Sequence, residues 1–198
     1  KPKGQLPNNE AVTKEVKLMM DPSADPFAAP AEDLSAGDGG TSVPDKFGAS
    51  DVMDLNWVQL LNAYTCTECG RCTSECPANQ TGKKLSPRKI MMDTRDRLEE
   101  VGKNIDANKG TFVPDGKQLL GDYISHEELW ACTTCNACVQ ACPVSIDPLS
   151  IIMDMRQYLV MEQSAAPSDL NTMMGNIENN GAPWPFNQQD RLNWSNES

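Results

Sequence analysis

The sequence lacks the features that would point to a membrane-spanning or nucleic-acid-binding chain. No segment approaches the roughly 20 consecutive apolar residues that cross a bilayer. The 17 Lys and Arg residues are outnumbered by 28 Asp and Glu residues, so the formal net charge is -11 at pH 7. A nucleic-acid partner is therefore not expected, because phosphate contacts require a basic surface.

Groups for catalysis are also scarce. The chain has one histidine, His126, and no glycine-rich dinucleotide fingerprint. His126 follows the helix-capping residue Ser125, where a solvated or packing role is favoured over a proton relay. All 8 cysteines lie in two short stretches, CTECGRCTSECP at 66–77 and CTTCNACVQACP at 132–143. If both stretches bind a cofactor, no thiol is left as a nucleophile, and no complete active site is expected.

The spacing within the two stretches indicates iron–sulfur clusters. Each follows C-x2-C-x2-C-x3-C-P, the bacterial ferredoxin run in which the fourth cysteine serves the other cluster. Three cysteines at steps of three wrap three corners of one cube, and the fourth lies too far along the chain to reach it. We predict two [4Fe-4S] clusters, one bound by Cys66, Cys69, Cys72 and Cys142, the other by Cys132, Cys135, Cys138 and Cys76.

Zinc and disulfides are the alternative uses of these cysteines. Thiolates suit zinc and copper(I) as well as iron–sulfur clusters. A zinc site usually takes two ligands from each C-x-x-C pair, whereas each stretch here has four cysteines followed by a proline. Clusters with a structural role, as in some nucleic-acid enzymes, are a further class, but such a domain should be basic.

Helix signals flank both stretches. Ser86 and Pro87 are an N-cap followed by a first-turn proline, and Gly102 is the predicted end of that helix. Ser125 and Glu128 have capping-box spacing, and Asp147 with Pro148 repeats the cap-then-proline signal. Apolar residues also recur at helical spacing. These are Met53, Trp57, Leu60, Leu61 and Tyr64 before the first stretch, and Ile90, Met91, Thr94, Leu98 and Val101 after it.

The two halves form a repeat of helix, cysteine stretch and helix. RKIMMDTRDRL at 88–98 matches LSIIMDMRQYL at 149–159. Two such units related by a pseudo-twofold axis would pack their apolar helix faces together in an all-α domain at 51–162. Residues 1–50, rich in Pro, Ala, Asp and Gly, are predicted to be an extended linker or partner-bound tether. Residues 163–198 are predicted to be a polar tail with a short helix and an aromatic docking segment.

On these motifs, widely separated on a helical frame, the sequence resembles the alpha-helical dicluster ferredoxin domain of the heterodisulfide reductase C-subunit family. Relatives of that family are the glycolate oxidase iron–sulfur subunit and the C-terminal domain of the succinate dehydrogenase iron–sulfur subunit. The chain lacks the plant-type cysteine set of a [2Fe-2S] centre that the last of these carries. The resemblance implies an electron-relay subunit of a membrane-associated oxidoreductase complex. A free soluble dicluster ferredoxin is the alternative.

The resemblance also implies partners and a location. The partners are other redox subunits, either one with CCG repeats or a membrane quinone or cytochrome b-type subunit. The chain begins at Lys1 without an initiator methionine. Some relatives carry a membrane-embedded domain ahead of the ferredoxin part, which makes residues 1–50 a hypothetical juxtamembrane tether. The expected location is cytoplasmic, peripheral to the inner face of the cell membrane.

Three further groups of residues have two interpretations each. The basic group is a solvated loop and helix start, or it stabilises a reduced cluster or docks an acidic partner. The methionines fill the core around the clusters, while haem ligation by methionine lacks a histidine partner. The aromatic residues near the C-terminus dock a partner or pack on the domain. The members are Lys83, Lys84, Arg88 and Lys89; Met91, Met92, Met153 and Met155; and Trp184, Phe186 and Trp194.

Overall fold

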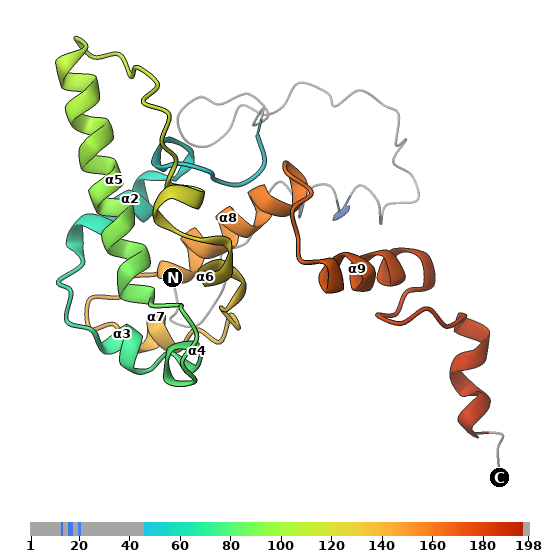
Figure 1. Cartoon of the computed structure of the whole chain (residues 1–198). Coiled ribbons are helices and arrows are strands. Elements are labelled where there is room, and N and C mark those ends of the chain that lie inside the picture. Colours follow the sequence, from blue (N-terminus) through green and yellow to red (C-terminus); the bar gives the residue numbers. More distant parts are fainter. Residues whose placement is uncertain (1–12, 14–15, 18–19, 21–45, 196–198) are drawn as a thin grey trace. The chain divides into compact units, whose positions relative to one another are not determined.

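The computed structural model describes residues 13, 16–17, 20 and 46–195 (Figure 1). Most of the tether predicted at 1–50 therefore lies outside the described residues. The chain divides into two compact units, Lys1–Tyr158 and Leu159–Ser198. The domain limits predicted at 50/51 and 162/163 stay predictions. Among the described residues there is no β-strand, so the all-α fold class is confirmed.

Helices account for the regular structure of both units. The first unit holds a 3-10 turn at Val52–Asp54, a further turn at Leu119–Tyr123 and most of α8. The second unit holds the last turn of α8 and a 3-10 segment at Gln188–Ser195. The α-helices are α2 (Trp57–Thr65), α3 (Arg71–Ser74), α4 (Pro77–Gln80), α5 (Pro87–Ala107), α6 (His126–Trp130), α7 (Ala137–Ala141), α8 (Pro148–Met161) and α9 (Ser168–Asn180).

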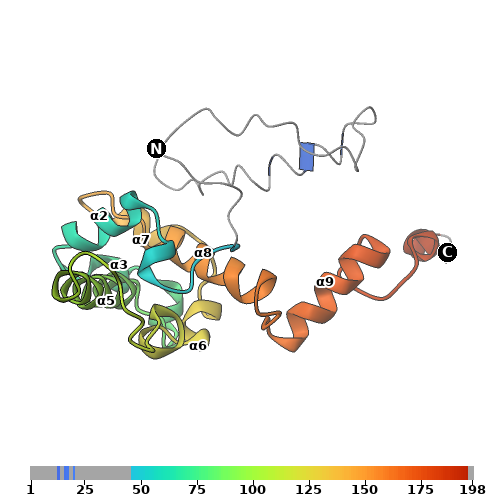
Figure 2. The same cartoon turned by 90° about the horizontal axis from the view of Figure 1, so that it is seen from above.

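The repeat is visible in the arrangement of the first unit. Each cysteine stretch lies between a helix that precedes it and a helix that follows it: α2 and α5 for the first, α6 and α8 for the second. The short helices inside the stretches, α3 and α7, contact each other, and α2 lies along α5 (Figures 1 and 2). The two cysteine stretches are thus brought together at one end of the first unit.

Local signals start the helices as predicted. The Ser86 side chain accepts a hydrogen bond from the Lys89 backbone N–H, and Pro87 occupies the first turn of α5. Ser125 and Glu128 form the predicted reciprocal capping box of α6. An equivalent capping box, Asn56 with Gln59, starts α2 and was not predicted, because asparagine and glutamine replace the usual serine and glutamate.

The predicted end of α5 is wrong. Gly102 lies inside the helix, which continues to Ala107. A glycine in a helix interior costs only about 1 kcal/mol relative to alanine, so one glycine does not end a long helix. Beyond it, Asn104 ties the helix to the following loop, because its side chain both donates to the carbonyl and accepts from the N–H of Val113, at 2.9 Å each. The helix ends where Gly110 donates its backbone N–H to the Ile105 carbonyl at 2.9 Å.

The two repeats are joined by polar contacts that cross between them. Gln59 of α2 donates to the Asp154 carboxylate of α8 at 2.5 Å. In the other direction, Lys89 of α5 lies 3.0 Å from the Glu128 carboxylate of α6 and 2.6 Å from Asp93. The helix in front of each cysteine stretch is therefore tied to the helix behind the other. The capping-box residues Gln59 and Glu128 serve both their own helix and the opposite repeat.

The chain enters the first unit through a close backbone approach to α8. Gly48 has a φ of +75°, and a Cβ there would lie 2.3 Å from the Asp154 carbonyl oxygen. The next residue, Ala49, donates its N–H to the same oxygen at 3.0 Å. Only glycine fits a left-handed residue with no room for a side chain.

The apolar face predicted for the segment around α2 is exposed, contrary to expectation. Trp57, Leu61 and Tyr64 are 67%, 51% and 51% exposed. The residues of α2 that are buried are Gln59 and Ala63. The small side chain of Ala63 lets α2 approach α5 closely, and Gln59 is held by its cross-repeat hydrogen bond. Burial of this helix is therefore set by close approach and hydrogen bonding rather than by its largest apolar side chains.

The face predicted for α5 is confirmed, except that Leu98 is only partly buried. Ile90, Met91, Thr94 and Val101 are buried. From α8, the buried residues with large apolar side chains are Leu149, Ile151, Ile152, Met155 and Leu159, several of them fully enclosed.

The same face of α5 carries a buried arginine that the sequence did not reveal. Arg97 is 0% exposed, and its guanidinium binds the carboxylates of Asp51 and Asp115 and the Lys117 carbonyl oxygen. These two carboxylates raise the pKa of Arg97 further, and Arg97 lowers the pKa of Asp115 to about 2. One side chain thus fastens both the chain entering the unit at Asp51 and the loop after α5.

We expect Arg97→Met to lower the thermal unfolding temperature of the cluster-loaded protein strongly. Removing one partner of a buried ion pair costs about 3–5 kcal/mol, because the remaining charges lose their compensation. The matched control is Lys103→Met on the same helix, where an exposed pair with Glu99 contributes about 0–1 kcal/mol. Equal unfolding temperatures for the two variants, measured by circular dichroism under anaerobic conditions, would contradict the structural role of Arg97.

The exposure of α2 gives a second stability prediction. Leu61→Ser should change the free energy of unfolding by no more than about 0.5 kcal/mol, as for ordinary surface substitutions. Ile90→Ala, at a fully buried position of α5, should cost about 2–5 kcal/mol. Thermal unfolding of the two variants beside the wild type tests the pair. A loss for Leu61→Ser as large as that for Ile90→Ala would mean that the α2 face is packed.

Candidate iron–sulfur site

The two cysteine stretches adopt the same unusual backbone. Glu68 and Thr134, at equivalent positions, both have a φ of 57°. Two residues further on, Gly70 and Asn136 have φ values of 80° and 62°. Left-handed residues are rare outside glycine and asparagine, so their recurrence at both equivalent positions marks a specific loop conformation. The second left-handed residue of each loop, Gly70 or Asn136, is the N-cap of the short helix that follows, α3 or α7.

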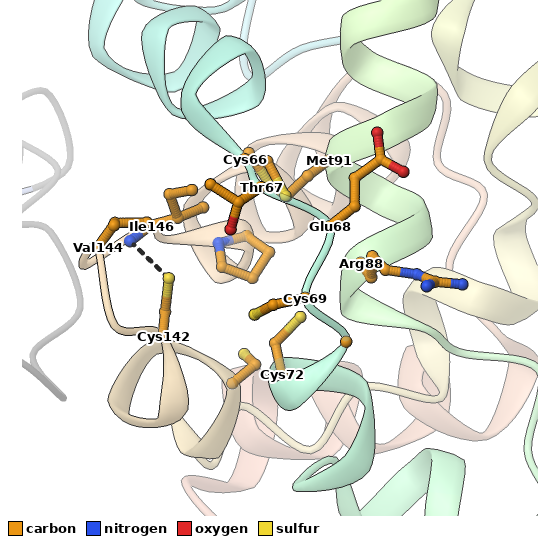
Figure 3. A pocket seen from close by; sticks show the side chains of 13 residues that line it. Cys66, Thr67, Glu68, Cys69, Cys72, Arg88, Met91, Cys142, Val144 and Ile146 are labelled. Atoms are coloured by element: carbon orange, nitrogen blue, oxygen red, sulfur yellow. Dashed lines mark hydrogen bonds between the residues drawn. The ribbon is translucent and has the colours of Figure 1, made fainter.

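The first loop and the end of the second stretch line one pocket. Four of its lining residues are the cysteines predicted to bind the first cluster, and Figure 3 shows Cys69, Cys72 and Cys142 facing the same space. Thiols of both stretches thus meet here, as the exchange of the fourth cysteine requires. The complete lining is Cys66, Thr67, Glu68, Cys69, Gly70, Cys72, Arg88, Met91, Cys138, Cys142, Val144, Ile146 and Pro148.

The second predicted set is also brought together. Cys76 and Cys135 lie close enough to Cys132 to influence its pKa, and Cys76 likewise influences Cys138. Cys138 packs against Cys72 and Cys132 in one apolar cluster, so the two sets are neighbours. Which four cysteines bind each cluster stays a prediction.

The exposure of the cysteines follows the repeat only in part. The middle cysteines of the two triplets, Cys69 and Cys135, are exposed, whereas the buried cysteines, Cys76 and Cys138, both belong to the second predicted set. Each set therefore has one cysteine at the surface, and the second set extends into the interior. Among the described residues, no group of three or more Cys, His, Asp or Glu side chains is arranged to hold a single metal ion.

Backbone N–H groups point at the sulfurs. The N–H of Thr134 donates to Cys132 Sγ at 3.4 Å, and the N–H of Ile146 donates to Cys142 Sγ at 3.3 Å, the contact drawn in Figure 3. Such bonds stabilise negative charge on thiolate ligands.

The buried thiols resist ionisation unless a cation is present. Burial raises the pKa of Cys72 and of Cys132, and it raises the pKa of Cys138 to about 12. The nearby charge of Arg156 opposes the rise at Cys132. A thiolate is stable in these positions when bound metal compensates its charge. The donor set, its N–H donors and its burial therefore fit iron–sulfur clusters.

Two arginines beside the loops were not recognised as site residues, although the repeat aligns them. Arg95 of α5 lies 2.6 Å from the carboxylate of Glu68 in the first loop. Arg156 of α8 donates to the carbonyl oxygens of Leu129 and Cys132, the latter at 2.5 Å. Their equivalent spacing from the two prolines that start α5 and α8 was the signal that could have identified them.

The remaining predicted groups have varied surroundings. His126 is exposed in the first turn of α6, which agrees with a solvated role. In the basic group, Lys84 forms an ion pair with Glu127, and Lys89 forms one with Glu128. Arg88 lines the pocket of the first cysteine set, with its guanidinium directed away from the sulfurs (Figure 3).

The methionines and the C-terminal aromatics were predicted to pack and to dock, respectively. Met91 lines the first pocket and Met153 packs against Cys138, as core filling predicts. Trp184, Phe186 and Trp194 are exposed, and their docking role stays a prediction.

Comparison with known proteins identifies the domain. Residues 65–146 match the family model of the 4Fe-4S dicluster domain, so this part of the chain belongs to that family. Eight cysteines in such a domain fit two [4Fe-4S] clusters, as predicted.

Individual relatives agree with this assignment. The chain is 37% identical over 183 residues to the probable iron-sulfur-binding oxidoreductase FadF of Bacillus subtilis, covering 78% of this chain and 26% of that protein. It is 32% identical over 169 residues to the EtfAB:quinone oxidoreductase of Syntrophomonas wolfei, covering 76% of this chain and 24% of that protein. The chain thus spans about a quarter of the length of these two relatives.

The predicted resemblance to the heterodisulfide reductase C-subunit family is also confirmed. The chain is 31% identical over 120 residues to the C-subunit of the Ferredoxin/F(420)H(2)-dependent CoB-CoM heterodisulfide reductase of Methanosarcina acetivorans. The alignment covers 60% of each of the two chains.

The exchange of the fourth cysteine can be tested with two fourfold variants. Replacing Cys66, Cys69, Cys72 and Cys142 by alanine should leave one complete site, because Cys76 stays with the second triplet. We expect about four iron atoms per chain and one [4Fe-4S] signal after anaerobic reconstitution.

The matched control replaces Cys66, Cys69, Cys72 and Cys76, which removes the same number of thiols within one stretch. It should leave the second triplet without its fourth ligand and hold no complete [4Fe-4S] cluster. If the control retained the full cluster and the first variant did not, each stretch would bind its own cluster and the exchange would be wrong.

Proposed function

We propose that this chain is the electron-relay part of an oxidoreductase complex. One cluster is held by Cys66, Cys69, Cys72 and Cys142, and the other by Cys132, Cys135, Cys138 and Cys76. The observation that carries the proposal is the contact between the two cysteine sets, combined with the exposure of one cysteine in each. The half-buried Cys72 packs against the buried Cys138, while Cys69 and Cys135 reach the surface.

This arrangement provides a path for single electrons. With clusters bound, the exposed Cys69 and Cys135 would place one edge of each site at the surface, and the packing of Cys72 against Cys138 would keep the two sites adjacent, so that single electrons could be relayed between partners. No proton transfer is required, and no described residue forms a nucleophile–base pair beside the pocket, whose lining is mostly cysteine and apolar residues. When bound, the clusters supply one-electron chemistry, and the protein sets their positions and potentials.

The proposed partners are other redox subunits or domains. The similarity to a component of heterodisulfide reductase supports assembly with such subunits. More specifically, we propose a CCG-repeat subunit or a membrane quinone or cytochrome b-type subunit. The name of the Syntrophomonas relative, a quinone oxidoreductase, supports the second of these.

The proposed location is the inner face of the cell membrane, with the chain peripheral to it. Quinones dissolve in the bilayer, so a relay that serves one works at the membrane surface. None of the helices in the described part of the chain has the length and apolar composition needed to span a bilayer.

The relay is tested first by its electron capacity. We expect the reconstituted full chain to bind about eight iron atoms and to accept two electrons in an anaerobic dithionite titration, one for each [4Fe-4S] cluster. Because the clusters are neighbours, electron paramagnetic resonance (EPR) of the fully reduced protein should show magnetic interaction that is weaker in the half-reduced protein. Binding of about two zinc ions and no iron would contradict the proposal.

Fixed assembly is tested in the native organism. A tagged chain should co-purify from detergent-solubilised membranes with a CCG-repeat subunit or a cytochrome b-type subunit. Recovery of the chain only as a soluble monomer would instead favour a free ferredoxin that carries electrons between enzymes.

A further inference from the structure

The pseudo-symmetry of the two cysteine loops is broken in its charges. The first loop is CTECGRC and the second is CTTCNAC, so Glu68 is replaced by Thr134 at the equivalent position. Both residues have a φ of 57°, which means that the change affects charge and not loop conformation. The arginines behind the loops, Arg95 and Arg156, are retained in both halves.

At the first loop the arginine is neutralised. Arg95 lies 2.6 Å from the Glu68 carboxylate and 3.7 Å from that of Asp96. Figure 3 shows the Glu68 carboxylate directed away from the sulfurs. Two other cations, Arg71 and Arg88, are exposed near this loop, where solvent and salt screen their charges. The local field of the first set therefore contains no buried, uncompensated positive charge among the described residues.

At the second loop the arginine keeps its charge. Arg156 is only partly exposed and donates to neutral groups, the carbonyl oxygens of Leu129 at 2.6 Å and Cys132 at 2.5 Å. Its guanidinium also lies 4.9 Å from the centre of the Trp130 ring. Among the described residues, no carboxylate lies within ion-pair distance of it. The hydrogen bond to the Cys132 carbonyl holds this positive charge directly beside a cysteine of the second set.

We propose that the uncompensated charge of Arg156 holds the reduction potential of the cluster on Cys132, Cys135, Cys138 and Cys76 above that of its neighbour. Reduction adds one negative charge to a cluster, and a fixed positive charge in a low-dielectric surrounding stabilises that state. A single electron added to the domain then resides at the second loop, with no proton taken up. This inference rests on the proposed function, and it assigns a single electron in the relay to the second cluster.

The test is an EPR-monitored redox titration of the full cluster-loaded chain. The two clusters are told apart with Cys69→Ser and Cys135→Ser, each of which alters the signal of one cluster. In the wild type we expect the cluster marked by Cys135→Ser to be reduced first. The equilibrium constant for transfer of one electron from the first cluster to the second measures the difference between their potentials. In Arg156→Gln this constant should fall towards unity by about tenfold or more. Arg156→Lys, which keeps the charge, should retain most of the difference.

Two substitutions that exchange side chains between the loops test the same idea without altering Arg156. Thr134→Glu gives the second loop the carboxylate of the first and should lower the potential of the second cluster. Glu68→Thr removes that carboxylate and should raise the potential of the first. Arg95→Gln, the matched control for Arg156→Gln, leaves Glu68 uncompensated and should widen the difference that Arg156→Gln narrows.

The outcomes separate this inference from the proposed function. Failure to load two clusters in the wild type would contradict the proposed function itself. Two loaded clusters whose potential difference is unchanged in Arg156→Gln and in Thr134→Glu would overturn the role of Arg156 and leave the relay intact. If Arg156→Gln does not load its second cluster, the result with Thr134→Glu alone decides, since the left-handed backbone of that position is already shared with a glutamate at the equivalent position of the first loop.

Discussion

The polar contacts that cross between the repeats are the constraint on which the cysteine sites depend. Two loops rich in thiols can share clusters only if they are held side by side. The hydrogen bond from Gln59 to Asp154 and the ion pair of Lys89 with Glu128 hold them so. Because each contact joins the helix before one loop to the helix after the other, both halves contribute to holding the two loops together. The short helices α3 and α7 then meet between the loops.

Within this symmetric frame, the differences between the halves carry the functional detail. The two loops have left-handed residues at the same two positions, but their side chains differ in charge. Symmetry therefore fixes where the clusters sit, and the departure from symmetry can distinguish them. A relay built from two identical sites would give an electron no preferred position.

Sequence predicted the local features well and the long-range ones poorly. The cysteine spacing and the caps at Ser86 and Ser125 are signals within a few residues, and these predictions were confirmed or stayed consistent with the structure. The burial of Arg97 depends on Asp51, which is distant in sequence and meets it only after folding. The exposed face of α2 was missed because periodicity shows which residues share a face and not whether a neighbour covers it.

The burial of the thiols affects how the cofactor is inserted, because each thiol must lose a proton before it binds iron. Burial raises the pKa of the Cys138 thiol, so removing its proton costs more there than in water. A thiol must lose its proton to bind iron, so cofactor insertion is an acid–base reaction as well as a coordination reaction. Acidic surroundings oppose insertion and favour release, whereas mildly alkaline surroundings favour uptake. The burial of this thiol thus makes cofactor biogenesis sensitive to the proton concentration of the compartment in which it occurs.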